Sequence, residues 1–146
     1  MNETPSDGPW RTIEVPGLAR PIGYAYGVES VRGRHITIAG KVAMDASGAV
    51  VHRGDMVAQA EMAFGHVKAV LDAAGARPEH LVRLRIFVTD IPAYQRESKA
   101  IGTGYRKHFG RHYPAMTLVQ VVRLFDEGAL IEVEGEAVVP DAGSPA

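Results

Sequence analysis

The last strand-forming segment of the chain, residues 130–139, constrains the fold more than any other. In it, Glu132, Glu134 and Glu136 alternate with apolar residues. Because successive side chains of a strand point to opposite faces of a sheet, the three carboxylates share one face and the apolar side chains share the other. The sequence therefore predicts a sheet with one face covered by the rest of the chain and one face carrying charged groups.

Two segments have the apolar spacing of a helix, and several have the short, β-branched composition of a strand. The first helix is predicted over residues 55–74, with Asp55 as its N-cap and Gly75 just past its end. The second is expected to begin after Asp90 and to run to about Phe109. Strands are predicted at residues 12–15, 24–31, 35–42, 81–88, 117–124 and 130–139, with a hairpin turn at residues 32–34.

This order, βββαβαββ, predicts an α+β domain in which two helices pack on one face of a single mixed sheet. Residues 1–8 and 140–146 are rich in small and polar residues and are expected to be disordered tails, which leaves one domain at residues 9–139. Arg83 and Arg85 share the sheet face opposite the helices. Paired with Glu134 and Glu136 on a neighbouring strand, they would contribute about 0.2–1 kcal/mol per pair. This second face must be solvated or covered by another subunit.

Composition argues against several classes of function. The net charge of −1, with acidic and basic residues interspersed, indicates no nucleic-acid partner. The absence of cysteine excludes disulfides and thiol chemistry. The six histidines show no metal-binding spacing, so no metal site is predicted. With no signal-peptide pattern and no apolar stretch of ~20 residues, a cytoplasmic protein without membrane contact is expected.

Five short motifs lie at residues 22–28, 36–40, 70–75, 85–90 and 113–115. In composition and order they resemble the motifs of the RidA/YjgF (Rid) superfamily. The resemblance implies a homotrimer with clefts between adjacent subunits. Such clefts hydrolyse 2-imino or enamine acids to 2-oxo acids and ammonia, with no metal or organic cofactor.

The resemblance also implies which residues line the cleft. They are the side chains of Tyr24, Met116, Thr117 and Glu132, together with the backbone of Gly40. Glu132 is expected to direct a water molecule, with Tyr24 as the second catalytic residue, while the Gly40 amide binds a substrate oxygen. Beside apolar groups such as Met116, the Glu132 carboxyl group is expected to have a raised pKa and to transfer a proton.

The chain departs from the family at Met116 and Gly102, and also at Ala39 and Lys41, where a serine and a glutamine are common. Met116 stands where an arginine usually binds the substrate carboxylate, a charge-assisted pair of about 1.5–3 kcal/mol. Gly102 stands where many members have a small polar side chain. The arginine's role could have moved to Arg106 or Arg123. Lys41 could supply a positive charge in the cleft or pair with a strand glutamate.

Three functions remain open for a small-molecule site of this kind. The first, which we prefer, is a hydrolase or deaminase acting on an imine, an enamine or a related metabolite. The second is a non-catalytic trimer that binds a metabolite or regulates another enzyme. The third is an enzyme of the same fold with a different reaction, such as a rearrangement or cyclisation. His112, beside the Tyr113–Pro114 turn, is the histidine expected near the cleft.

Overall fold

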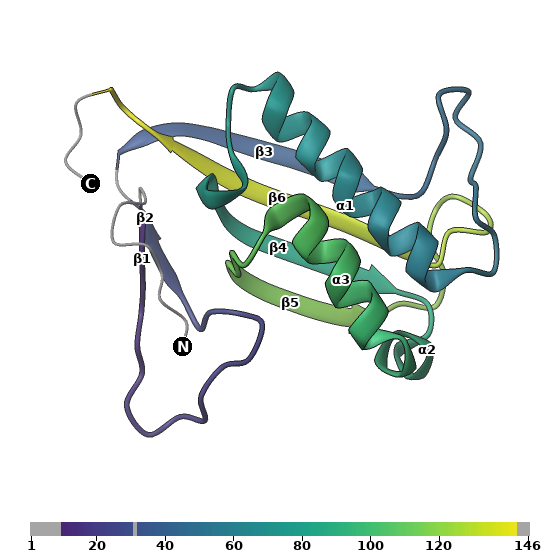
Figure 1. The fold of residues 1–146 in the computed structure, drawn as a ribbon, viewed down its shortest axis with the longest axis horizontal. Coiled ribbons are helices and arrows are strands. Elements are labelled where there is room, and N and C mark those ends of the chain that lie inside the picture. The colour runs from purple at the N-terminus through teal and green to yellow at the C-terminus, as the bar shows by residue number, and fades with distance from the viewer. Residues whose placement is uncertain (1–9, 31, 143–146) are drawn as a thin grey trace.

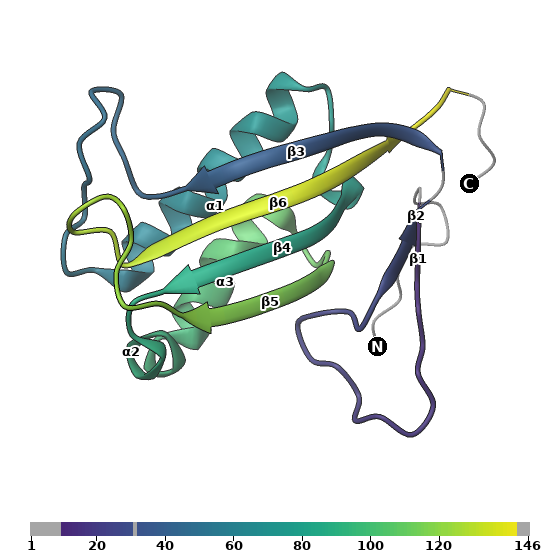
Figure 2. The ribbon, with the colours of Figure 1, turned by 180° about the vertical axis from the view of Figure 1, so that it is seen from behind.

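The main body of the protein is a four-stranded mixed sheet with helices on one face, seen in a computed structural model that describes residues 10–30 and 32–142 (Figures 1 and 2). β6 runs antiparallel to both of its neighbours, and β4 and β5 run parallel. The predicted α+β class is therefore confirmed. In sheet order the strands are β3 (Gly33–Lys41), β6 (Ile131–Pro140), β4 (Leu81–Val88) and β5 (Ala115–Gln120).

Helices α1 (Met56–Ala73) and α3 (Ser98–Phe109) cover one face of the sheet, here called the helix face (Figure 1). The other is the open face (Figure 2). Asp55 caps α1 as predicted, accepting from the Ala58 amide at 3.0 Å. The predicted second helix is divided at Glu97, where φ is −98° and ψ is 8°, into α2 (Ile91–Arg96) and α3. No proline or glycine marks this break.

The hydrophobic core lies between the helices and the helix face. The predicted apolar stripe on α1 is buried over most of its length, although Val57 is only partly buried. A bulge in β4, between Leu81 and Arg83, places Leu81 in the core and leaves Val82 half-buried. The largest fully buried apolar side chains are Phe64, Phe109, Ile38, Leu71, Leu81, Leu84, Ile86 and Ile131.

Gln59 is a polar residue of α1 that is fully buried in this core. Its amide nitrogen donates to the carbonyl oxygens of Val51, His52 and Gly128 at 3.3, 3.2 and 2.9 Å. Its side-chain oxygen accepts from the Leu130 amide at 2.8 Å. The side chain therefore ties the loop before α1 to the loop that leads into β6, and these hydrogen bonds offset the cost of burying an amide.

β1 (Trp10–Thr12) and β2 (Val28–Ser30) form a separate two-stranded antiparallel sheet instead of extending the main one (Figure 1). The predicted hairpin at residues 32–34 is wrong, because β3 pairs with β6 and not with β2. Gly33 makes this possible: a Cβ there would lie 2.1 Å from the Val139 carbonyl oxygen. Glycine therefore allows the two backbones to approach.

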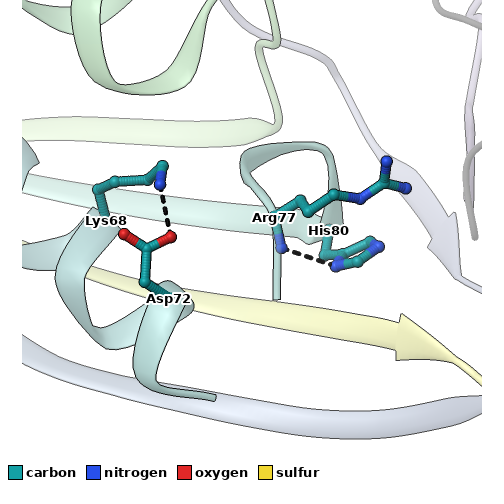
Figure 3. Close-up of polar contacts among 4 residues, drawn as sticks. All are labelled: Lys68, Asp72, Arg77 and His80. Carbon is teal, nitrogen blue, oxygen red and sulfur yellow. Dashed lines mark hydrogen bonds and ion pairs between the residues drawn. The ribbon is translucent and has the colours of Figure 1, made fainter. Parts of the chain in front are cut away.

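Local polar contacts occur in the last turns of α1 and in the connection from α1 to β4, which passes through a 3-10 helix at Pro78–His80 (Figure 3). Lys68 and Asp72 form an ion pair one turn apart on α1. The Arg77 amide donates to His80 Nδ1 at 2.9 Å. Burial, and then the charge of Arg77, lower the pKa of His80, which keeps the ring neutral and able to accept this bond.

The predicted tail at residues 1–8 lies outside the described residues, as do residues 143–146 of the second tail. Pro140 is still part of β6, where it pairs with Gly33. Among residues 10–30 and 32–142, no helix has both the length and the apolar character needed to span a bilayer.

Candidate functional site

Glu132 of β6 and Gly40 of β3 meet on the open face. A Cβ on Gly40 would lie 2.1 Å from Glu132 Oε1 and 2.7 Å from its Cδ, so the carboxylate occupies the space that only glycine leaves empty. The register between β3 and β6 shifts between Ile38 and Lys41, and this bulge presents the Gly40 backbone to the carboxylate. The structure thus brings together two residues of the expected cleft.

The surroundings of Glu132 favour its neutral form more than water would. Burial raises the pKa of Glu132, and the negative charges of Asp126 and Glu134 raise it further. Phe87 of β4 lies opposite Glu132 and packs against a small apolar cluster that includes Val42. A carboxyl group whose pKa is raised toward neutrality is a better proton acceptor for catalysis than an ordinary surface glutamate.

The other two glutamates of β6 have structural partners. Arg85 Nη1 lies 2.5 Å from Glu134 Oε1, and Arg85 Nη2 lies 3.9 Å from Glu136 Oε1. This is the cross-strand pairing expected from the sequence, with one arginine serving both carboxylates. In the described part of the chain, Glu132 alone of the three makes no ion pair. Its carboxylate therefore remains available for a substrate or a water molecule.

Met116 lies on the helix face, not beside Glu132. The parallel register of β4 and β5 places Met116 opposite Leu84, whose side chain is in the core. The raised pKa of Glu132 therefore has a different cause from the expected contact with Met116. It comes from the burial of Glu132 on the open face and from the acidic groups nearby.

Met116 forms part of an open pocket of about 710 Å³, here called the Met116 pocket. Met116 and Ile86 supply the sheet side of the pocket, and residues 20–23 supply one wall. The Ala25 amide donates to the Pro114 carbonyl oxygen at 3.1 Å, which holds this part of the chain against the edge of β5. The volume falls within the range of small-molecule sites.

Aromatic rings line the helical side of the Met116 pocket. The Tyr105 ring stacks on Tyr113 with centroids 5.3 Å apart, and Tyr94 contributes a third ring. The Tyr105 hydroxyl donates to the His112 carbonyl oxygen at 2.6 Å. Burial raises the pKa of Tyr105. This hydroxyl therefore stays protonated and already has an acceptor, so Tyr105 offers the pocket an apolar ring.

Gly102 and Arg106 of α3 also line the Met116 pocket, together with Arg20. A Cβ on Gly102 would lie 3.3 Å from Arg106 Nη1. Of the two alternative arginines, Arg106 thus shares a pocket with Met116, whereas Arg123 lies in the connection from β5 to β6 and is not among the pocket residues. Arg106 is a candidate from the sequence alone, but its place in the pocket depends on the packing of α3.

Thr117 and Tyr24, which were also expected in the cleft, lie at separate places in the structure. Thr117 is exposed on the open face, opposite Arg85, so it shares a face with Glu132. The Tyr24 ring packs edge-on against Tyr26 at 5.7 Å and is not among the pocket residues. The structure therefore brings neither Thr117 nor Tyr24 into the Met116 pocket.

Neither Lys41 nor His112 is among the residues that line the Met116 pocket. Lys41 pairs with Val133, whose side chain is in the core, so Lys41 leaves the strand on the side opposite Glu132. In residues 10–30 and 32–142 it forms no ion pair, so the expected pairing with a strand glutamate is absent. His112 is buried, with Nε2 2.8 Å from the Leu81 carbonyl oxygen, and burial lowers its pKa.

The candidate site therefore consists of two parts on opposite faces of the sheet. One is the carboxylate of Glu132 on Gly40, and the other is the Met116 pocket with its arginines. The sheet itself separates them within one chain. Over the described residues, no three histidine, aspartate or glutamate side chains gather closely enough to hold a metal ion.

This fold and these two parts define a small α+β protein of the Rid type. The family model described as Endoribonuclease L-PSP matches residues 19–139, most of the chain. The chain belongs to this family, and with it to the RidA/YjgF superfamily.

Relatives and solved structures agree with this assignment. Protein DfrA of Myxococcus xanthus is 33% identical over 129 residues, covering 88% of this chain and 95% of that protein. A 2-iminobutanoate/2-iminopropanoate deaminase of Salmonella typhimurium is 31% identical over 133 residues, covering 88% and 97%. The structure of the Rid protein YyfB from Yersinia pestis aligns with a TM-score of 0.80 at 31% identity, covering 90% of this chain and 99% of that one.

Proposed function

We propose that this protein is a cofactor-free hydrolase that deaminates a small imine or enamine. The observation that carries the proposal is the Glu132 carboxylate, seated on Gly40 and without an ion-pair partner among the described residues. In the reaction, water adds to the imine carbon while Glu132 accepts a proton from it. Glu132 passes this proton to the nitrogen, which gives a carbinolamine. The hydroxyl group then loses its proton to the nitrogen, the carbon–nitrogen bond breaks, and ammonia and a carbonyl product remain.

Two properties of the relatives support this chemistry. Several relatives at about 30% identity are named 2-iminobutanoate/2-iminopropanoate deaminases. The structure of TdcF from Escherichia coli, 28% identical with a TM-score of 0.61, is described with bound serine, a small molecule that carries an amine and a carboxylate. An endoribonuclease, as in the family description, fits less well, because RNA binding draws on positive charge and this chain has a net charge of −1.

We further propose that the active site forms between subunits of a homotrimer. A substrate that contacts both Glu132 and the Met116 pocket requires a second copy, since the sheet separates them within one chain. The open face also carries half-exposed charges, and the nearby connection from β5 to β6 exposes two large apolar residues. Val122 and Phe125 are 101% and 94% exposed, and a neighbouring subunit would cover them.

An imine-trapping competition tests the reaction. An amino-acid oxidase produces a 2-imino acid, semicarbazide captures it, and the protein competes by hydrolysing it. We expect wild type to lower the yield of semicarbazone and Glu132→Gln to lose about 100-fold or more of this activity, the usual contribution of a general base. Activity should rise with pH through the pKa of Glu132, because the ionised form accepts the proton.

Glu136→Gln is the matched control, since it removes a carboxylate from the same strand and face. It should keep most of the activity. Equal rates for wild type and Glu132→Gln would refute the assigned role of this residue, and no competition by wild type with any 2-imino acid would refute the deaminase.

A second function, metabolite binding without turnover, is favoured by one observation. Met116 and the surrounding rings make the pocket largely apolar, and methionine adapts to varied shapes. A ligand that copurifies with the trimer and binds wild type and Glu132→Gln equally, in the absence of any turnover, would support this alternative.

A further inference from the structure

We propose that Arg106 binds the carboxylate of the substrate in place of the missing arginine, and that the substrate carries a bulky apolar or aromatic side group. The inference rests on the proposed function for the reaction, but it concerns binding and is tested without turnover. It would account together for Met116 and Gly102, two of the departures expected from the sequence, because the positive charge would lie on the helical side of the pocket, at Arg106.

The position of Arg106 follows from the geometry of α3. Gly102 and Arg106 lie four residues apart, on neighbouring turns of one helix face. The 3.3 Å between Arg106 Nη1 and a Cβ placed on Gly102 shows that the guanidinium group folds back across the glycine. Both residues line the pocket. A larger side chain at position 102 would displace the guanidinium group, so glycine here makes room for the arginine.

The charge of Arg106 is available to a ligand. Its hydrogen bond to Thr103 Oγ1 is long, 3.4 Å, and in the described part of the chain it forms no ion pair. Arg20 lines the same pocket, and among the described residues no aspartate or glutamate does. The pocket therefore combines two positive charges with no competing carboxylate. The planar fork of a guanidinium group matches a carboxylate with two parallel hydrogen bonds.

The rest of the pocket indicates the body of the ligand. Tyr94, Tyr105 and Tyr113 contribute rings, and Ile101 and Met116 contribute apolar surface. The volume of about 710 Å³ is far more than a three- or four-carbon imino acid fills. An aromatic or branched side group would contact these rings and exclude water from them. The substrate class is therefore a 2-imino acid, or its enamine tautomer, with such a group.

Calorimetric titration with stable product analogues tests this inference. The probes are benzoylformate, which has a carboxylate and a ring, its uncharged methyl ester, and pyruvate, which has a carboxylate and no ring. We expect wild type to bind benzoylformate at least tenfold more tightly than either of the others. Arg106→Gln should weaken benzoylformate binding by about 10- to 100-fold, as expected for a charge-assisted pair, and should leave ester binding unchanged.

Three further variants complete the experiment. Arg96→Gln removes an exposed arginine outside the pocket and should bind like wild type. Gly102→Leu should weaken acid binding by displacing Arg106. Met116→Arg, added to Arg106→Gln, should restore acid binding. Equal benzoylformate affinity in Arg106→Gln and Arg96→Gln would overturn the inference, as would the absence of binding by wild type at millimolar concentration.

The two proposals fail in different ways. Arg106→Gln could lose acid binding while no form of the protein turns over an imine. That result would support this inference and refute the deaminase. Turnover that depends on Glu132 but is unchanged in Arg106→Gln would support the deaminase and refute this inference.

Discussion

Replacing Gln59 by methionine tests how the fold presents Glu132. Gln59 is fully buried, and its side chain joins the loop before α1 to the residues that lead into β6. Methionine has a similar length and fills the same space, but it neither donates nor accepts these hydrogen bonds. The change therefore removes the polar network at constant volume.

The structure sets the expected magnitude. The Leu130 amide loses its acceptor at 2.8 Å, and three carbonyl oxygens lose their shared donor. A buried donor left without an acceptor costs about 1–3 kcal/mol, and the lost donations add to this. The apolar methionine offsets part of the cost. We expect the free energy of unfolding to fall by about 2–4 kcal/mol, and Tm to fall by about 5–15 °C.

Thermal and urea unfolding at one protein concentration measure the effect, since oligomer stability depends on concentration. Gln95→Met is the matched control, because Gln95 is exposed on α2. It should change stability by less than about 0.5 kcal/mol. If Gln59→Met proved as stable as Gln95→Met, the buried network would not hold this end of the sheet, and the reasoning would be refuted.

Three further predictions concern the two sheet faces. Gly40→Ala should lower imine hydrolysis by about 100-fold with little change in Tm, because its Cβ would push the flexible Glu132 carboxylate by roughly 1 Å; unchanged activity would contradict the geometry. A double-mutant cycle of Arg85→Met and Glu134→Met should give a coupling of about 0.2–1 kcal/mol, as both groups are about one-third exposed; a much larger coupling would show that this pair is deeply buried in solution. Burial lowers the pKa of His112, so the unfolded chain binds more protons and stability should fall as pH drops below about 6.5. His112→Gln should flatten this fall in unfolding measured from pH 7 to 5, whereas an unchanged slope would assign the fall to other groups.

Much of the fold could be predicted because its signals are local. The alternation in β6 correctly placed the three glutamates on one face, and Asp55 marked the start of α1. The break at Glu97 had no such signal, because no proline or glycine accompanies it. In the sequence, nothing distinguishes Gln59 from an exposed polar residue of a helix. Its role depends on loops far away in the sequence, at residues 51–52 and 128–130.

The candidate site was less predictable because strand register decides it. β5 is apolar at successive positions, so its composition does not reveal which residues face the helices. Only the pairing with β4 places Met116 opposite Leu84 and on the other face from Glu132. A one-residue bulge in β3 likewise sends the Lys41 side chain to the face opposite Glu132. Motifs can name such residues, but long-range pairing determines which of them meet.

The central proposal is that the site joins the Glu132 of one subunit to the Met116 pocket, with its Arg106, of another. The most direct test is to unfold Glu132→Gln and Arg106→Gln together, refold them as a 1:1 mixture, and measure imine hydrolysis with an aromatic substrate. In the proposed trimer, each cleft would take one face from each of two chains. About a quarter of the clefts would then contain both intact groups, so we predict recovery to about a quarter of wild-type activity from two nearly inactive proteins. A mixture no more active than the average of its two components would contradict a site shared between subunits.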